Sequence, residues 1–376
     1  MTARVVIAPD RWGPVSSPQI AEAMARGWRA RNPSVDVRVC PQSNGDAGLV
    51  DAVAGADPAV TTGVLEVPGS TGSPVLVPYA QVEDEGLPTA YLAMDSGTPP
   101  GKPGSSYGTG HAIGKLIAAG ARRVVIGLAD SGTLDGGSGL IAALAGADPH
   151  EPPGAGNAVA ARDLLRSRDV RLIAAYDTSI PLLGLTGAAA AAQDTLGLDP
   201  YAAQEAESRM SRWARELAQV LPGRADLLTG KPHRHDRAAG SGAGGGAGFA
   251  LASLGAELRP AAEVVAEATG LADALAAGDL VVTGTLVFDW RQLTDSVVSQ
   301  VGARALSAAR PALILAGRVD VGRRELMSLG FSGGYGVVQT PRTPLPAAPA
   351  QLVAAAEHLA RRVAGTWTPT HSTPGG

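Results

Sequence analysis

Four aspartates could contribute carboxylates to a reaction, because each lies in a loop that follows a short apolar run: Asp10, Asp135, Asp177 and Asp289. Carboxylate oxygens hold Mg²⁺, and one carboxylate can also accept the proton of an attacking hydroxyl. The set therefore favours metal-assisted phosphoryl transfer. An aspartate after a strand can also cap the next helix or close a turn, so each one alone has a structural explanation as well.

The segment 123–139 has the pattern of a strand, a glycine-rich loop and a helix. Unpaired N–H groups at the start of such a helix, reached past small residues, can bind an anion. Asp130 and Asp135 could hold a cation beside that anion. The loop has neither the Gly-Lys-Ser/Thr of a P-loop nor the Rossmann spacing, so phosphate binding here is a hypothesis. Its candidate residues are Gly127, Ser131, Thr133, Asp135, Gly136 and Gly137.

Three further groups of residues have a functional and a structural interpretation each. The hydroxyls of Ser105, Ser106 and Thr109 could bind a second anion before a helix, although capping explains the serines equally well. His233 and His235 lack the further ligands of a zinc site, which favours a solvated loop. The glycines over 242–248 indicate either a nucleotide-facing loop or a flexible linker.

Composition limits the class of protein before any motif is considered. The chain has 376 residues, enough for two α/β domains, with 45% apolar residues and a net charge of -4. Nothing in this balance predicts a nucleic-acid partner or a membrane surface. A single cysteine, Cys40, suits a reducing compartment and excludes an internal disulfide framework. With no signal-peptide pattern at the N-terminus, we expect a cytoplasmic protein.

Alternating strand and helix patterns at both ends of the chain, with antiparallel-type strands between, predict the architecture. We expect an α/β protein in which a discontinuous doubly wound, Rossmann-like parallel-sheet domain carries an inserted second α/β domain. Functional residues of such sheets lie beyond the carboxyl ends of the strands, where all four aspartates are expected. The predicted boundaries are 1–57, 105–176 and 279–365 for the Rossmann-like domain, 58–104 and 177–278 for the inserted domain, and 366–376 for a disordered tail.

Several segments resemble motifs of the type-I glycerate kinase family, in the family's order. Residues 5–10 are similar to "VIAPDSFKGS", 105–110 to "SSFGTG", and 127–137 to "GIGGSATxDGG". Residues 177–189 resemble "DVDNPLLGPRGAA", 242–248 "GAAGGLG", and 281–289 "VITGEGRxD". The resemblance implies two α/β domains with a cleft between them and ATP-dependent phosphorylation of D-glycerate with Mg²⁺.

The resemblance also assigns roles to individual residues. Asp177 would be the catalytic base or a metal ligand, and Asp10 and Asp289 would be catalytic, metal or substrate ligands. Arg11, Asn44 and Asp46 stand where the chain departs from the family motifs, and they are the candidate substrate contacts, with Arg11 as the nearest cation by position for the substrate carboxylate. ATP would be bound by residues of the glycine-rich and hydroxyl-bearing loops, namely Ser105, Ser106, Thr109, Gly127, Ser131, Thr133, Asp135, Gly136, Gly137 and Gly284.

The chain departs from the family pattern at several signature positions. Arg11-Trp12-Gly13 replaces Ser-Phe-Lys, and Ser179 and Ile180 replace the second Asp and the Asn of "DVDNP". The expected function is phosphorylation of D-glycerate or a related small hydroxy acid by a monomer or homodimer. Two alternatives stay open: a catalytically impaired pseudokinase with a binding or regulatory role, and an enzyme whose pocket Ile180 and Phe288 make more apolar.

Overall fold

The computed structural model describes residues 2–69, 72–94, 101–129, 131–151, 153–223, 230, 232–340 and 342–367. The chain forms two compact units. The first contains residues 1–44, 51–58 and 262–376, and the second contains residues 45–50 and 59–261. Each unit has its own mixed α/β architecture with a six-stranded sheet, so the predicted α/β class with a discontinuous domain is confirmed.

The first unit is built on a parallel sheet in the order β10-β11-β9-β1-β2, with β12 also paired to β11. The predicted first βαβ unit is present, since β1 and β2 pair in parallel and α1 connects them. The elements are β1 (Arg4–Ile7), α1 (Ser17–Arg31), β2 (Asp36–Val39), α9 (Ala261–Ala268), α10 (Leu271–Ala277), β9 (Leu280–Thr283), β10 (Val287–Phe288), η3 (Trp290–Gln292), α11 (Val297–Ser307), β11 (Ala312–Val319), α12 (Arg323–Ser328), β12 (Phe331–Val338) and α13 (Pro349–Trp367).

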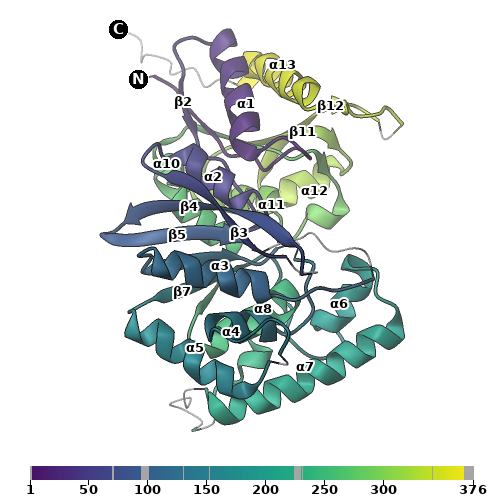
Figure 1. The fold of residues 1–376 in the computed structure, drawn as a ribbon. Coiled ribbons are helices and arrows are strands. Elements are labelled where there is room, and N and C mark those ends of the chain that lie inside the picture. The colour runs from purple at the N-terminus through teal and green to yellow at the C-terminus, as the bar shows by residue number, and fades with distance from the viewer. Residues whose placement is uncertain are drawn as a thin grey trace. The chain divides into compact units, whose positions relative to one another are not determined.

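Helices α1 and α13 lie side by side in this unit (Figure 1). Gly27 of α1 permits the close approach, because a Cβ there would lie 2.2 Å from the carbonyl oxygen of Glu357. Arg26 and Glu357 add an exposed ion pair with a 2.9 Å Nε–Oε2 distance. The pair Ser17-Pro18 predicts a helix start with Ser17 as N-cap; α1 does start there, but its N-cap is Ser16, one residue earlier, and the proline lies in the first turn.

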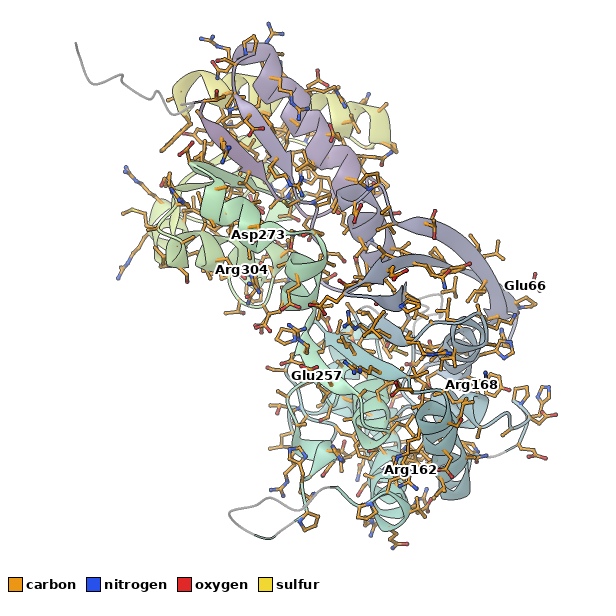
Figure 2. The ribbon with its side chains drawn as sticks, turned by 90° about the vertical axis from the view of Figure 1, so that its left-hand side faces the viewer. Glu66, Arg162, Arg168, Glu257, Asp273 and Arg304 are labelled. Atoms are coloured by element: carbon orange, nitrogen blue, oxygen red, sulfur yellow. The ribbon has the colours of Figure 1, made fainter. Side chains whose placement is uncertain are left out.

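The second unit contains the sheet β3-β4-β5-β6-β7-β8, antiparallel from β3 to β5 and parallel from β5 to β8. Exposed charges such as Glu66, Arg168 and Glu257 lie on its surface (Figure 2). The elements are β3 (Thr61–Pro68), β4 (Pro74–Asp84), β5 (Leu87–Ala93), α3 (Tyr107–Ala118), β6 (Arg123–Gly127), α4 (Ser138–Leu144), α5 (Ala155–Ser167), β7 (Arg171–Tyr176), α6 (Ala188–Thr195), α7 (Pro200–Val220), η1 (His235–Arg237), η2 (Ala243–Gly246), α8 (Ala247–Ser253) and β8 (Glu257–Pro260). Helix α2 (Leu49–Ala56) begins in this unit and continues into the first.

Sheet pairing distributes the strands differently from the predicted boundaries. Residues 105–176 were expected with the N-terminal strands, yet β6 pairs with β5, and β7 pairs with β6 and β8. Alternation of strands and helices reveals that a strand is parallel but not which sheet it joins, because pairing partners come from distant parts of the sequence.

Three local predictions also need correction. Proline, glycine and polar residues in the segment 146–168 predict a polar connection, but most of the segment forms α5, whose apolar face packs Ala158, Ala161 and Leu165 into the core. The glycine-rich segment 242–248 is not a flexible linker, since nearly all of it is buried in η2 and α8. Helix α13 extends to Trp367, two residues into the expected tail, and 368–376 lie outside the described residues, as does Asp130.

Among the helices that the structure describes, none is both long enough and apolar enough to span a bilayer.

Candidate active site

A cavity of about 520 Å³ in the second unit brings together residues from several predicted motifs. Ser131 and Thr133 come from the loop after β6, and Asp177 comes directly after β7. Both strands belong to the parallel part of the sheet, so their carboxyl ends meet at one edge. Three of the predicted site residues therefore line one cavity.

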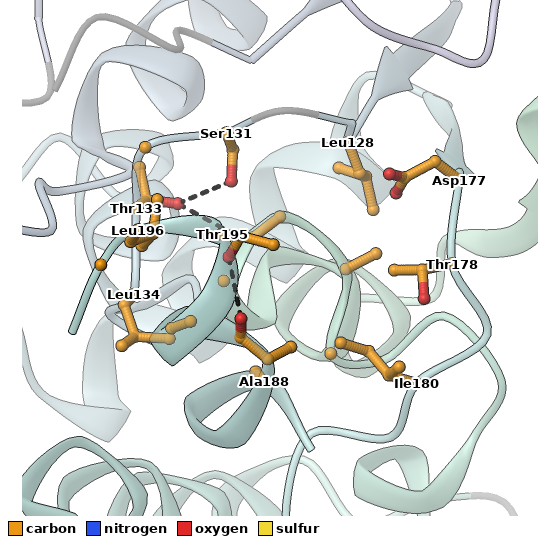
Figure 3. A pocket seen from close by; sticks show the side chains of 18 residues that line it. Leu128, Ser131, Thr133, Leu134, Asp177, Thr178, Ile180, Ala188, Thr195 and Leu196 are labelled. Carbon is orange, nitrogen blue, oxygen red and sulfur yellow. Dashed lines mark hydrogen bonds between the residues drawn. The ribbon is translucent and has the colours of Figure 1, made fainter. Parts of the chain in front are cut away.

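Ser131 and Asp177 both lie in the upper part of the view of this cavity, on opposite sides (Figure 3). The hydroxyls of Ser131 and Thr133 are 3.4 Å apart, and Thr133 Oγ1 donates to the carbonyl oxygen of Gly244 at 3.0 Å. Thr178 contributes a further hydroxyl to the lining. With Thr195, the described lining offers one carboxylate and four hydroxyl groups, which suit a ligand rich in oxygen.

The glycine-rich segment forms another wall of the cavity, through Gly242, Ala243, Gly244 and Gly245. Gly245 has φ +60°, and a Cβ there would lie 1.8 Å from the carbonyl oxygen of Thr133. Only glycine therefore lets this segment pack against the 131–134 loop. The predicted nucleotide-facing interpretation stays open, and the cavity gives it a specific location.

Hydrocarbon side chains cover the rest of the lining. They come from the ends of β6 and of the 131–134 loop, from the segment after Asp177, and from α6 and the residue that follows it. They are Leu128, Leu134, Ile180, Ala188, Ala191, Ala192 and Leu196. Leu134, Ala188 and Ile180 lie in the lower part of the view, away from Ser131 and Asp177 (Figure 3). Leu128 lies instead in the upper part of the view, between Ser131 and Asp177 (Figure 3). The lower part of the view is therefore mainly apolar, and we call it the apolar side of the cavity.

Asp135 does not line this cavity but joins the starts of α3 and α4. Its carboxylate accepts hydrogen bonds from the Ser106 N–H at 2.8 Å and hydroxyl at 2.9 Å, and from the Ser105 hydroxyl at 3.3 Å. It also accepts from the N–H groups of Gly137 and Gly139 at 2.9 and 3.2 Å. These contacts describe a structural role of the kind that capping predicted.

The neighbouring candidates also have structural explanations. The Ser106 hydroxyl, fully buried, accepts a hydrogen bond from the Leu140 N–H at 2.9 Å as well as donating to Asp135. Gly137 has φ +72°, and a Cβ there would lie 2.3 Å from Ala250. At Gly127 a Cβ would lie 2.2 Å from the carbonyl oxygen of Gly45. Thr109 and Gly136 are buried in the same region and do not contribute to the described lining of the cavity.

The first unit carries Asp10 and Asp289, the other two of the four aspartates that follow strands. The Asp10 N–H donates to the carbonyl oxygen of Gly284 at 2.8 Å, which places these two residues together beyond β1 and β9, as the strand-end argument expected. A Cβ at Gly284 would lie 1.7 Å from the carbonyl oxygen of Leu315, so packing against β11 requires glycine there. Arg11 Nε donates to the carbonyl oxygen of Gly13 at 2.9 Å.

Asp289 and Phe288 illustrate how neighbours in sequence differ in role. Asp289 Oδ1 accepts from the Arg291 N–H at 2.9 Å and caps the short η3 helix. Phe288 is fully buried in the core of the first unit, so the expectation that it makes a pocket more apolar is wrong. Its strand, β10, pairs with β11, and the Phe288 side chain packs into the hydrophobic core instead of lining a pocket.

Asn44 and Asp46 belong to the loop that leads into α2. Asp46 is buried, and its Oδ1 accepts from the Gly48 N–H at 2.8 Å while its carbonyl oxygen accepts from the Leu49 N–H at 2.9 Å. These two bonds satisfy N–H groups at the start of the helix. Asn44 is half-buried, and its predicted contact with substrate stays a prediction.

The histidine segment is held by an ion pair. Arg234 Nε donates to Asp236 Oδ1 at 2.7 Å, and this hydrogen-bonded guanidinium holds the pKa of the Asp236 carboxyl below its ordinary value. Burial lowers the pKa of His235, and the nearby His233 lowers it further. In the described part of the chain, no group of three or more His, Cys, Asp or Glu side chains is arranged to hold a metal ion.

Sequence reasoning missed most of the cavity's apolar lining. Ala188, Ala191 and Ala192 belong to a run of five alanines, which the high alanine content of the chain makes inconspicuous. Their spacing would place them on one face of a helix, but the pattern does not indicate whether that face covers a core or a cavity. Thr195 and Leu196, at the end of α6, carry no sequence signal of their own.

Comparison with known proteins finds relatives along nearly the whole chain. The model of the glycerate kinase family matches residues 5–368. An uncharacterised protein of Mycobacterium bovis is 34% identical over 375 residues, covering 96% of this chain and 91% of that protein. The glycerate kinase of Bacillus subtilis is 29% identical over 358 residues, covering 89% and 90%. The crystal structure of a candidate glycerate kinase 2 from Salmonella typhimurium LT2 has a TM-score of 0.74 at 27% identity, covering 97% of this chain and 98% of that one.

A match over nearly the whole chain, in both sequence and fold, covers the cavity as well as the two sheets. The chain therefore belongs to the glycerate kinase family of phosphotransferases.

Proposed function

We propose that this protein transfers the γ-phosphoryl group of ATP, assisted by Mg²⁺, to a hydroxyl of D-glycerate or of a related small hydroxy acid. One observation supports this most directly. Asp177 lines the same cavity as the hydroxyls of Ser131, Thr133 and Thr178 and the glycine-rich 242–245 segment. A carboxylate beside several hydrogen-bond donors in a single cavity suits a reaction that moves a proton and stabilises charged oxygens.

Asp177 is the proposed base. As the acceptor hydroxyl oxygen forms its bond to the γ-phosphorus, its proton passes to the Asp177 carboxylate, from which solvent removes it. The bond between the γ-phosphorus and the bridging oxygen breaks, and ADP leaves with that electron pair. The hydroxyls of Ser131 and Thr133 would orient the phosphoryl oxygens, because Thr133 is itself held by its bond to Gly244.

The donor set of the cavity is compatible with Mg²⁺, since that ion binds proteins through one or two carboxylates together with substrate phosphates. Asp177 is the carboxylate of the described lining. When bound, the ion would neutralise charge on the phosphate oxygens. Metal or substrate contacts by Asp10 and Asp289, and substrate contacts by Arg11, Asn44 and Asp46, stay predictions, as do a monomeric or homodimeric state and a cytoplasmic location.

The test is a coupled assay of ADP release with D-glycerate, ATP and Mg²⁺, applied to wild type and Asp177→Asn. The substitution keeps the size of the side chain and removes its capacity to accept a proton. Loss of a general base lowers kcat by about 10²- to 10⁴-fold. Asp163→Asn is the matched control, because that aspartate is exposed on α5 and away from the cavity.

Equal loss of activity in both variants, or full activity of Asp177→Asn, would contradict the proposed role of Asp177. A folded wild-type protein that turns over none of a panel of hydroxy acids would favour the pseudokinase alternative. Thermal shift separates binding from turnover, because ATP-Mg²⁺ at 100 times its Kd adds about 2.7 kcal/mol of stability.

A further inference from the structure

The cavity has an apolar side that glycerate does not need. Every carbon of glycerate bears oxygen, so a three-carbon acid has no hydrocarbon surface to place against the cavity's aliphatic side chains. Polar groups turned toward such a wall lose hydrogen bonds to water without replacing them.

The apolar side chains line the same cavity as the proposed base, and one of them lies near that base in the sequence. Ile180 follows Asp177 by three residues in one segment, and both line the cavity together with Thr178. Figure 3 shows Ile180 on the same side of the view as Asp177 and Thr178, with Ala188 between Ile180 and Leu134. A molecule whose hydroxyl reaches Asp177 therefore has hydrocarbon within reach of its other substituent.

We propose that the acceptor is a hydroxy acid that carries an aliphatic substituent, and that Ile180 and the alanine face of α6 bind this substituent. The inference rests on the proposed function, because it takes the group next to Asp177 to be the acceptor. Ile180 is then a specificity-determining residue. The alternative occupant of the apolar side is the adenine ring of the nucleotide, which the experiment distinguishes.

The experiment measures kcat/KM of the full chain at saturating ATP-Mg²⁺ for four acceptors of increasing length: D-glycerate, 2,3-dihydroxybutanoate, 2,3-dihydroxypentanoate and 2,3-dihydroxyhexanoate. Burying each added methylene raises kcat/KM about fourfold, or roughly 15-fold for two carbons. In Ile180→Asn the series becomes flat or reverses, because the amide requires hydrogen-bond partners that an alkyl chain lacks. Leu185→Asn makes the same change at a side chain that is 99% exposed, and keeps the wild-type trend.

Ile180→Ala is a second variant, which shortens the side chain without adding a polar group. In this variant we expect a smaller rise in kcat/KM for each added methylene than in the wild type. Melting temperatures without ligand show that each variant is folded. The shift in melting temperature that each acceptor produces gives a readout independent of turnover, and it rises along the series in the wild type.

A wild type that turns over D-glycerate faster than every longer acceptor would overturn this inference and leave the proposed function intact. An Ile180→Asn variant with an unchanged acceptor series but a raised KM for ATP would also overturn it, and would assign the apolar side to the nucleotide. If no acceptor is phosphorylated, the proposed function fails. The melting-temperature shifts produced by the four acceptors then test the inference alone. Equal shifts for all four would refute a binding site for the aliphatic substituent.

Discussion

Two glycines on helix α3 should respond in opposite directions to the same substitution. At Gly110 a Cβ would lie 2.3 Å from the carbonyl oxygen of Leu140 and 2.9 Å from the Cβ of Ala143, both on α4. One turn later, at Gly114, no described atom outside the helix's own backbone lies within 4 Å of the added Cβ. Both positions are helical, so alanine restricts the unfolded chain equally in the two variants.

The expected magnitudes follow from these distances. Gly114→Ala stabilises the protein by about 0.5–1 kcal/mol, the usual gain when alanine replaces glycine inside a helix. Gly110→Ala has the same gain but must move α3 away from α4, and such overpacking costs about 1–3 kcal/mol. The free energies of unfolding of the two variants should therefore differ by roughly 1–3 kcal/mol, with Gly110→Ala the less stable.

Urea unfolding followed by circular dichroism measures this difference, provided that the m-values of the variants agree. The comparison also addresses the motif over 105–110, for which close packing of α3 against α4 is a sufficient reason for glycine. A Gly110→Ala variant as stable as Gly114→Ala would refute the packing argument. Activity lost at Gly110→Ala with unchanged stability would favour a ligand-binding role instead.

Two further outcomes follow from the same unit. Asp135→Asn should lower the free energy of unfolding by about 3–5 kcal/mol in urea titrations, because several charge-assisted hydrogen bonds to the starts of α3 and α4 weaken together. The control Asp163→Asn should change the free energy of unfolding by less than about 0.5 kcal/mol. An equally small effect of Asp135→Asn would contradict the structural role of Asp135. Because the pKa of His235 is lower in the folded protein than its ordinary value of 6.5, the unfolded chain binds a proton at His235 more readily than the folded protein does. The contribution of His235 to stability is therefore complete above pH 6.5, and it is lost as the pH falls from 6.5 through the pKa of His235 in the folded protein. Between pH 7.5 and 5 the melting temperature of His235→Gln should fall less steeply than that of the wild type. The control His150→Gln, at an exposed histidine, should keep the wild-type slope. If His235→Gln also keeps the wild-type slope, His235 does not cause the loss of stability.

Several elements of the fold could be predicted because their signals are local. The pair Ser17-Pro18 at the beginning of α1 identifies its start to within one residue, and the alternating residues of β3 and β4 identify antiparallel strands. The connection 146–168 was missed as a helix because proline and glycine at its beginning conceal the later amphipathic pattern of α5. A local sequence pattern predicts secondary structure poorly when one segment contains both a loop and a helix.

The candidate site shows the same division. Asp177, Ser131 and Thr133 were predicted from their places after strands, and they line one cavity. Asp135 was predicted by the same argument, yet it accepts hydrogen bonds from the starts of α3 and α4. The residue type is identical in the two cases, and only the neighbours that the fold supplies differ.

The sequence by itself determined the α/β class, the parallel strands, the glycine-rich loops and the set of carboxylates from which a site could be built. Tertiary structure decided which sheet received β6 and β7, that Phe288 enters a core, and that Ile180 and the alanines of α6 line a cavity beside Asp177. The reason is physical: helix and strand periodicity depends on residues a few positions apart, whereas strand pairing and side-chain surroundings depend on contacts between segments far apart in the chain.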